Sequence, residues 1–150
     1  GEADLVDDCA IRKENNGEET SERDCIGFCV TGGVFSEGID LKNESLIGCI
    51  IVGTGIPQIC TERRLLKDYY DEKDGNGYNY AYTYPGMNKV LQAAGRVIRT
   101  MDDVGVIVLL DERFARSEYV RLFPAEWADY KLCRLSEVPQ LVAEFWDGHR

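Results

Sequence analysis

The chain has 150 residues, a size that fits one domain with its own hydrophobic core. Hydrophobic residues make up 44% and charged residues 29%, so the composition excludes collagen-like, coiled-coil and fully disordered proteins. With 17 basic and 27 acidic residues the net charge is −10, which argues against broad electrostatic capture of nucleic acid by this chain alone.

The N-terminal residues 1–23 are polar and acidic, and they predict a short helix near Ala3–Lys13 followed by a partly disordered linker. Residues 1–8 carry acids where a signal peptide would carry bases, and no apolar run reaches the ~18 residues of a membrane span. We therefore expect a cytoplasmic protein without a membrane segment, whose folded domain covers residues 24–150.

Three apolar runs predict buried strands, at Cys25–Val30, Leu46–Val52 and Val104–Leu110. Because they are nearly continuous and are separated by helical stretches, they favour an α/β domain with a mainly parallel sheet covered on both faces. Three strands make a small sheet for such a domain, so we expect it to be truncated at its N-terminus.

The helices predicted between and after these strands are set by apolar spacing and capping residues. They lie at about Pro57–Glu72, about Pro85–Thr100, near Glu112–Glu118 with Asp111 as cap, and about Glu137–Trp146 with Ser136 as cap. The sequence Asp74-Gly75-Asn76-Gly77 predicts a turn between the first two of them.

The six cysteines show no CxxC pair, and the closest two, Cys25 and Cys29, are separated by three residues. The single histidine, His149, stands at the extreme end of the chain. A zinc site of familiar ligand spacing is therefore unsupported, and we predict reduced core cysteines and no bound metal.

The segment Pro85–Arg99 has an apolar stripe at helical spacing and an opposite polar face that holds Gln92, Arg96 and Arg99. No acidic residue shares that face. Two interpretations stay open here: a site for an anion supplied from elsewhere, or a solvated helix face.

A glycine-rich loop, residues 32–41, follows the first predicted strand and contains Glu37, Gly38 and Asp40. Glycines let the backbone approach a ligand, and the two carboxylates can accept hydrogen bonds from ribose hydroxyls or hold an arginine. A plain structural turn is the alternative.

Taken together, these segments resemble a known family. Ser36-Glu37-Gly38-Ile39-Asp40-Leu41 resembles motif V, and Gln92-Ala93-Ala94-Gly95-Arg96-Val97-Ile98-Arg99 resembles motif VI, of the DinG/XPD-type DNA helicases in helicase superfamily 2. The third strand, ending in Asp111-Glu112-Arg113-Phe114, also matches, and the resemblance spans about Cys25–Leu135. One departure concerns DNA contacts: Gly32 stands where many superfamily members have threonine, so that contact is not transferred.

The resemblance implies a RecA-like second motor domain, of the P-loop NTPase type, that closes onto ATP and Mg²⁺ held mainly by a first motor domain. That first domain would supply the phosphate loop, the magnesium-binding acids and, in this family, an iron–sulfur cluster; no GxxxxGK[ST] phosphate loop occurs in this chain. The roles that the resemblance implies are an arginine finger for Arg99, a second phosphate or interdomain contact for Arg96 and polar positioning for Gln92. For the motif V loop they are a ribose contact for Asp40 and loop shape for Glu37 and Gly38.

We therefore interpret the chain as the C-terminal motor domain of an ATP-dependent DNA helicase, inactive alone, with the N-terminal motor domain and single-stranded or forked DNA as partners. The alternative is a non-catalytic interaction or regulatory module with a helicase-like fold. A complete small nucleotide-binding enzyme is disfavoured by the missing phosphate loop. No DNA-contacting residues are assigned: four alternating tyrosines, Tyr78 to Tyr84, favour packing over base stacking, and Arg63, Arg64 and Lys67 favour a solvated or ion-paired surface.

Overall fold

The computed structural model describes residues 26–31, 33, 46–100 and 102–149. The helix predicted near Ala3–Lys13 lies outside these residues. In chain order the elements are β1 (Gly48–Val52), α2 (Thr61–Asp74), the π-helical segment η1 (Asn79–Thr83), α3 (Tyr84–Ala94), β2 (Val106–Leu110), the 3₁₀ turn η2 (Glu112–Ala115), α4 (Ser117–Val120), the 3₁₀ turns η3 (Ala125–Trp127) and η4 (Leu135–Glu137), and α5 (Val138–Asp147). Within the described ranges, no helix is both long and apolar enough to cross a membrane.

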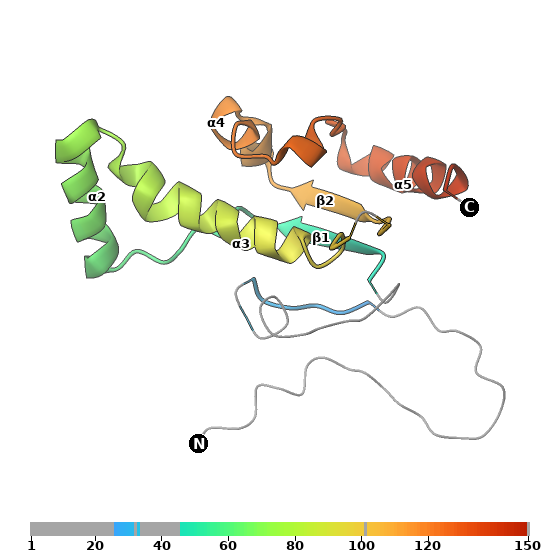
Figure 1. Cartoon of the computed structure of the whole chain (residues 1–150), viewed down its shortest axis with the longest axis horizontal. Coiled ribbons are helices and arrows are strands. Elements are labelled where there is room, and N and C mark those ends of the chain that lie inside the picture. The colour runs from blue at the N-terminus through green and yellow to red at the C-terminus, as the bar shows by residue number, and fades with distance from the viewer. Residues whose placement is uncertain (1–25, 32, 34–45, 101, 150) are drawn as a thin grey trace, which may run out of the picture.

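The two strands pair in parallel, from Gly48 opposite Val106 to Val52 opposite Leu110. The connection between them runs through α2, η1 and α3, and α3 packs against β1, so this unit is a β-α-β crossover (Figure 1). The parallel sheet and its two strands confirm the prediction, with strand bounds a few residues shorter.

Along β1, only the face that carries Ile51 is buried in the part of the chain that the structure describes. Ile51 is buried against α3, whereas Ile50 and Val52, which point the other way, are 67% and 71% exposed. Because successive side chains of a strand alternate between faces, these exposures place α3 on the Ile51 face alone. The expected cover on both faces is therefore not seen in these ranges.

The apolar run predicted as the first strand does not form one in the described residues 26–30. Ile26, Phe28 and Val30 are 86%, 86% and 80% exposed. Apolar composition predicts burial, but a strand also needs a hydrogen-bonding partner, and among the described residues the sheet contains β1 and β2 alone. This prediction is wrong for these five residues; Cys25 lies outside the described ranges.

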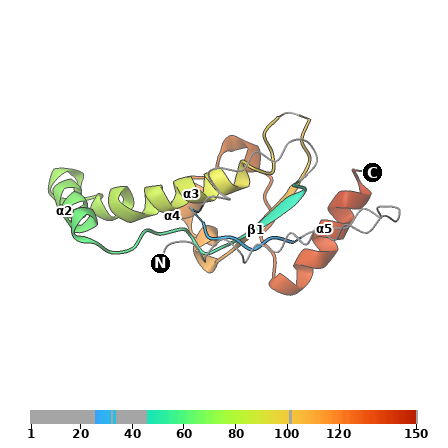
Figure 2. The same cartoon turned by 90° about the horizontal axis from the view of Figure 1, so that it is seen from below.

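The core forms where α3 meets the sheet and the segment after β2. Its buried members are Ile51, Met87, Val90, Ala94, Phe114 and Tyr119. Three of these come from the apolar stripe predicted for α3, which confirms the helical spacing over that part of the segment. Figure 2 shows α2 and α5 at opposite ends of the molecule, with α3 and β1 between them.

Helix α3 ends at Ala94 rather than near Thr100. The N–H groups of Gly95, Arg96 and Val97 bond back to Leu91, Ala93 and Ala94 in a closing turn. Glycine is a poor helix former, and apolar residues that continue the 3.6-residue period past it do not extend the helix. Ile98, expected on the buried stripe, is consequently 43% exposed.

A proline explains why a π-helical segment precedes α3. Pro85 has no N–H to offer the carbonyl of Ala81, and its ring disfavours a regular turn before it. The Tyr84 N–H bonds to Asn79 O, five residues back, and Arg63 Nη1 donates to Ala81 O at 2.8 Å. Arg63 is thus tied to the backbone of η1, which differs from the solvated or ion-paired surface predicted for it.

Two close backbone approaches fix the start of α3 near the end of β1. A Cβ on Gly86 would lie 2.6 Å from Thr54 O, so only glycine lets α3 lie this close to the chain that leaves β1. Gly55, at that crossing, has φ +62°. Helix α2 runs from Thr61 to Asp74, and Gly75, which caps its end, takes the left-handed conformation at the predicted turn.

The C-terminal elements differ from the prediction in extent and in capping, because the helix expected near Glu112–Glu118 is divided into η2 and α4. The Asp111 side chain caps η2 by accepting from the Arg113 N–H, as expected. Ser136 does not cap α5; it lies inside η4, and α5 begins without a side-chain cap. The Glu137 carboxylate accepts from the Arg134 N–H at 2.6 Å, a bond that closes η4.

Candidate functional site

The motif VI residues gather where α3 ends. Gln92 is exposed near the end of α3, Arg96 is half-buried in the closing turn, and Arg99 is exposed three residues later. The expectation that all three share one helix face is wrong, since Arg96 and Arg99 lie beyond the last helical residue. Their positions are set by the turn.

This turn lies at the N-terminal edge of the sheet. Gly105, just before β2, faces both the Val97 side chain and the Ile47 carbonyl, and a Cβ there would clash with Val97. The Val106 N–H also donates to Ile47 O at 3.0 Å. Glycine at position 105 therefore lets the arginine-bearing turn rest against the start of both strands.

Asp103 closes the loop that carries Arg99. One carboxylate oxygen, Oδ2, accepts from the Arg99 N–H at 2.8 Å and from the Thr100 N–H at 2.7 Å. These two bonds, Arg99 first, hold the pKa of Asp103 below its ordinary value. Sequence analysis missed this residue: an aspartate four positions after an arginine becomes a signal only once the helix is known to end before it.

The other predicted nucleotide contacts, Glu37, Gly38 and Asp40, lie outside the described residues. Their relation to Arg96 and Arg99 therefore stays a prediction.

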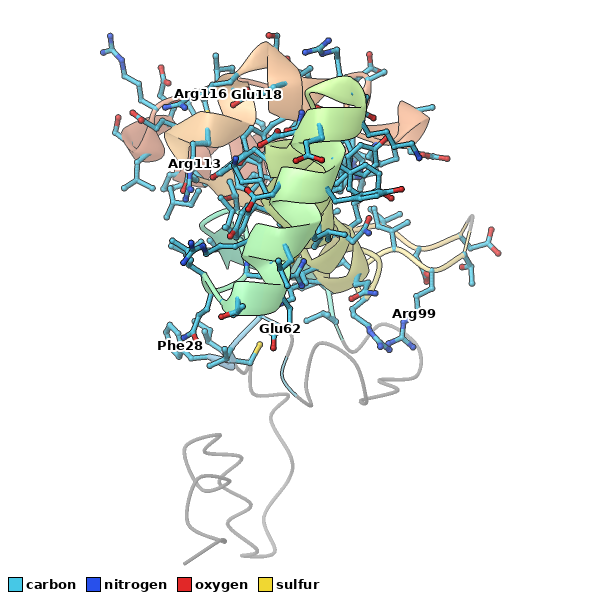
Figure 3. All side chains as sticks on the ribbon, turned by 90° about the vertical axis from the view of Figure 1, so that its left-hand side faces the viewer. Phe28, Glu62, Arg99, Arg113, Arg116 and Glu118 are labelled. Atoms are coloured by element: carbon cyan, nitrogen blue, oxygen red, sulfur yellow. The ribbon has the colours of Figure 1, made fainter. Side chains whose placement is uncertain are left out.

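The Asp111–Phe114 segment lies at the opposite, C-terminal edge of the sheet. Asp111 accepts from Arg113 Nε at 2.9 Å and from Nη2 at 2.7 Å, a forked ion pair that lowers the pKa of Asp111 to about 2. Figure 3 shows Arg113 on the other side of the molecule from Arg99. This segment shapes the end of β2 and does not meet the arginines of motif VI.

The alternating tyrosines pack against one another and against α2. Tyr80 stacks on Tyr70 with ring centroids 4.1 Å apart and meets Tyr84 edge-on at 5.3 Å. Tyr82, 5% exposed, pairs with Tyr78. These contacts support the packing interpretation that the sequence favoured.

The described cysteines are free thiols, and of these Cys49 packs against the core as predicted whereas the other three do not. Cys29, Cys60 and Cys133 are exposed and only Cys49 is half-buried. Burial, followed by the nearby Cys29, raises the pKa of the Cys49 thiol to about 11. Within the ranges that the structure covers, no three His, Cys, Asp or Glu residues are grouped to hold a metal ion.

The comparisons with known proteins decide the family. The sequence matches the family described as the helicase C-terminal domain over residues 10–130. The chain belongs to this helicase C-terminal domain family. That range contains both predicted motifs, and the parallel strands with their crossover helix are compatible with its α/β, RecA-like fold.

Individual relatives of this helicase domain carry helicase names. The chain is 37% identical over 97 residues to the general transcription and DNA repair factor IIH helicase subunit XPD/RAD3 of Saccharomyces cerevisiae, covering 63% of this chain and 12% of the relative. It is 36% identical over 124 residues to the regulator of telomere elongation helicase 1 homolog of Caenorhabditis elegans, covering 77% and 12%. It is 35% identical over 89 residues to the ATP-dependent DNA helicase DinG of Photobacterium profundum, covering 58% and 13%. The aligned part thus spans 12–13% of the length of these relatives.

Proposed function

We propose that this domain is the C-terminal motor domain of an ATP-dependent DNA helicase, which offers Arg99 to ATP bound on a first motor domain. The observation that carries the proposal is the placement of Arg99: exposed, beyond the end of α3, on a loop whose backbone is fixed by Asp103. The names of the relatives, ATP-dependent DNA helicases among them, support the reaction class.

The chemistry explains why an arginine belongs at this position. Phosphoryl transfer spreads negative charge over the γ-phosphate oxygens, and a planar guanidinium can meet two of them with fixed donors. Such a finger supplied from another domain is worth ~10³ to 10⁵ in rate where it has been measured. Arg99 takes this role in the proposal, and Arg96, half-buried one turn earlier, contacts a second phosphate or the domain interface.

The nucleotide is shared between two domains in this scheme. Arg96 and Arg99 fit the anionic end of ATP because both are cations at one edge of the sheet. Gln92 is the polar positioner, Asp40 faces the ribose, and Glu37 and Gly38 shape the motif V loop. Mg²⁺ would neutralise the β- and γ-phosphates and would be held by acids of the first motor domain, as would any iron–sulfur cluster upstream.

Splitting the site in this way couples hydrolysis to movement. The finger reaches ATP only when the two domains close, and loss of the γ-phosphate removes the contact that favours the closed state. Alternate closing and opening then moves single-stranded or forked DNA past the enzyme. We place the protein in the cytoplasm, with a role in DNA repair, as predictions that accompany this function.

The test is DNA-stimulated ATP hydrolysis by the two-domain protein. We expect Arg99→Ala to lower kcat by a factor of ~10² or more with its melting temperature and DNA affinity retained, because an exposed donor contributes little to stability. Arg99→Lys should restore little, since an ammonium is a point charge. Arg64→Ala, which removes an exposed arginine from α2, is the matched control and should leave kcat unchanged.

The alternative function, a non-catalytic module, makes the opposite prediction. It expects no DNA-stimulated ATPase in the wild-type two-domain protein, or activity that is equal in the wild-type protein and the Arg99→Ala variant. Either result would contradict the proposal.

A further inference from the structure

Asp103 holds the backbone of the loop after α3 at two neighbouring residues, Arg99 and Thr100. The described residues Ile98 and Arg99 belong to no helix or strand, and both are exposed. The Asp103 carboxylate binds the N–H groups of Arg99 and Thr100 through a single oxygen. A third, weaker bond, from the Asp103 N–H to Thr100 O at 3.4 Å, closes the same turn.

These bonds act on the backbone from which the Arg99 side chain starts. A hydrogen bond from an amide to an ionised carboxylate is roughly twice as strong as one between neutral groups. Fixing the Arg99 backbone before ATP arrives removes part of the entropy that ordering a surface loop would otherwise cost during the reaction. A transition-state donor contributes fully only when it is already in place.

We propose that Asp103 is a positioning residue for hydrolysis, holding the Arg99 backbone so that the guanidinium is presented to the γ-phosphate across the domain interface. This inference rests on the proposed function of Arg99. Asp103 itself does not touch the nucleotide.

The charge state of Asp103 suits this role. Its pKa is lowered, first by the Arg99 N–H, then by the Thr100 N–H, with the Arg99 charge adding to the effect. The carboxylate therefore stays ionised over the whole neutral range and remains a charged acceptor for both N–H groups. The adjacent Asp102 is exposed and provides a charge-matched neighbour for comparison.

The experiment is steady-state ATPase kinetics, with saturating single-stranded DNA, on the two-domain protein and five variants: Asp103→Ala, Asp103→Asn, Asp102→Asn, Arg99→Ala and Arg99→Ala/Asp103→Ala. We expect Asp103→Ala to lower kcat ~10-fold with little change in KM for ATP, because the loss falls on the transition state. Asp103→Asn keeps an acceptor oxygen without its charge and should lose less. Asp102→Asn should match the wild type.

The double variant separates positioning from general stability. If Asp103 acts through Arg99, removing it in the Arg99→Ala background costs less than ~2-fold further, whereas independent effects would multiply. Amide hydrogen exchange at Arg99 and Thr100 should also speed up in Asp103→Asn while the amides of α3 keep their protection.

Distinct results overturn the two claims. A normal kcat in Asp103→Ala, or a loss that multiplies with that of Arg99→Ala, overturns the positioning role while Arg99 keeps its own. A normal kcat in Arg99→Ala overturns the proposed function itself. If Asp103→Ala has lost its melting transition, the Asp103→Asn kinetics and exchange decide: unchanged values in both would overturn the inference.

Discussion

Asp111 and Arg113 show how a short motif can be structural although it resembles a functional signature. Their forked ion pair, with the Asp111 side chain only 15% exposed, clamps the end of β2 to η2. Arg99 and Asp103 form the contrasting case at the other edge of the sheet, where the carboxylate holds the backbone of Arg99. Asp111 binds the side chain of its arginine, which is thereby occupied in an ion pair. Asp103 binds the backbone N–H of Arg99 and so fixes the loop on which that side chain stands.

The lowered pKa of Asp111 predicts a pH-dependent contribution to stability. Because the folded-state value is about 2 and the ordinary value is 3.8, the stabilisation is fully present above pH 4 and is lost as the pH falls towards 2. Asp111→Ala should lower the free energy of unfolding by about 1 kcal/mol at pH 7. This figure allows for solvent screening of the partly exposed Arg113. Denaturant unfolding at pH 7 and at pH 2.5 measures it.

The control for that measurement is Glu112→Ala, which breaks the exposed pair between Glu112 and Arg116 and should change stability little at either pH. A stability difference for Asp111→Ala that is as large at pH 2.5 as at pH 7 would contradict the ion-pair explanation.

At the scale of elements, η1 depends on a side chain from a different helix. Arg63→Ala leaves the fully buried Ala81 carbonyl without its donor and should destabilise the domain by about 1 to 2 kcal/mol. In a Pro85→Ala background the cost should shrink, because the new N–H can bond to the same carbonyl. Denaturant unfolding of the wild type, Arg63→Ala, Pro85→Ala and the double variant measures both costs. If Arg63→Ala lowers the free energy of unfolding equally in both backgrounds, the explanation is contradicted.

The elements also show what sequence can and cannot supply. Continuous apolar runs located β1 and β2, and apolar periodicity located the buried face of α3, because burial itself produces these patterns. The same pattern did not predict where α3 ends. Val97 and Ile98 continue the helical period, but the helix has already ended at Gly95. The strand predicted over residues 26–30 was wrong for a related reason, because apolar composition does not indicate which strand would supply the hydrogen bonds.

The candidate site was predictable by residue type and not by geometry. Arg96 and Arg99 were found through their spacing within motif VI, yet their placement comes from a turn held by Gly105 and Asp103. Both contacts join residues that are several positions apart and meet only in the folded chain. Sequence periodicity carries no information about them.

On the scale of the whole molecule, the proposal makes this chain half of a catalytic site. We expect the 150-residue chain alone to hydrolyse ATP no faster than a buffer blank, because its arginines lack a phosphate loop to act upon. A phosphate-release assay measures this. Turnover by the isolated chain that disappears in Arg99→Ala would show that the chain carries a complete site, contrary to the proposal.

The most direct test of the central claim, that Arg99 serves the transition state of ATP hydrolysis, compares two ligands on the two-domain protein. ADP with aluminium fluoride and Mg²⁺ imitates the transferring phosphoryl group, whereas ADP alone lacks it. Titration calorimetry should show Arg99→Ala weakening the aluminium fluoride complex ~10²-fold while the Kd for ADP changes by less than ~3-fold. Equal affinity of the wild-type and variant proteins for the aluminium fluoride complex would contradict the account.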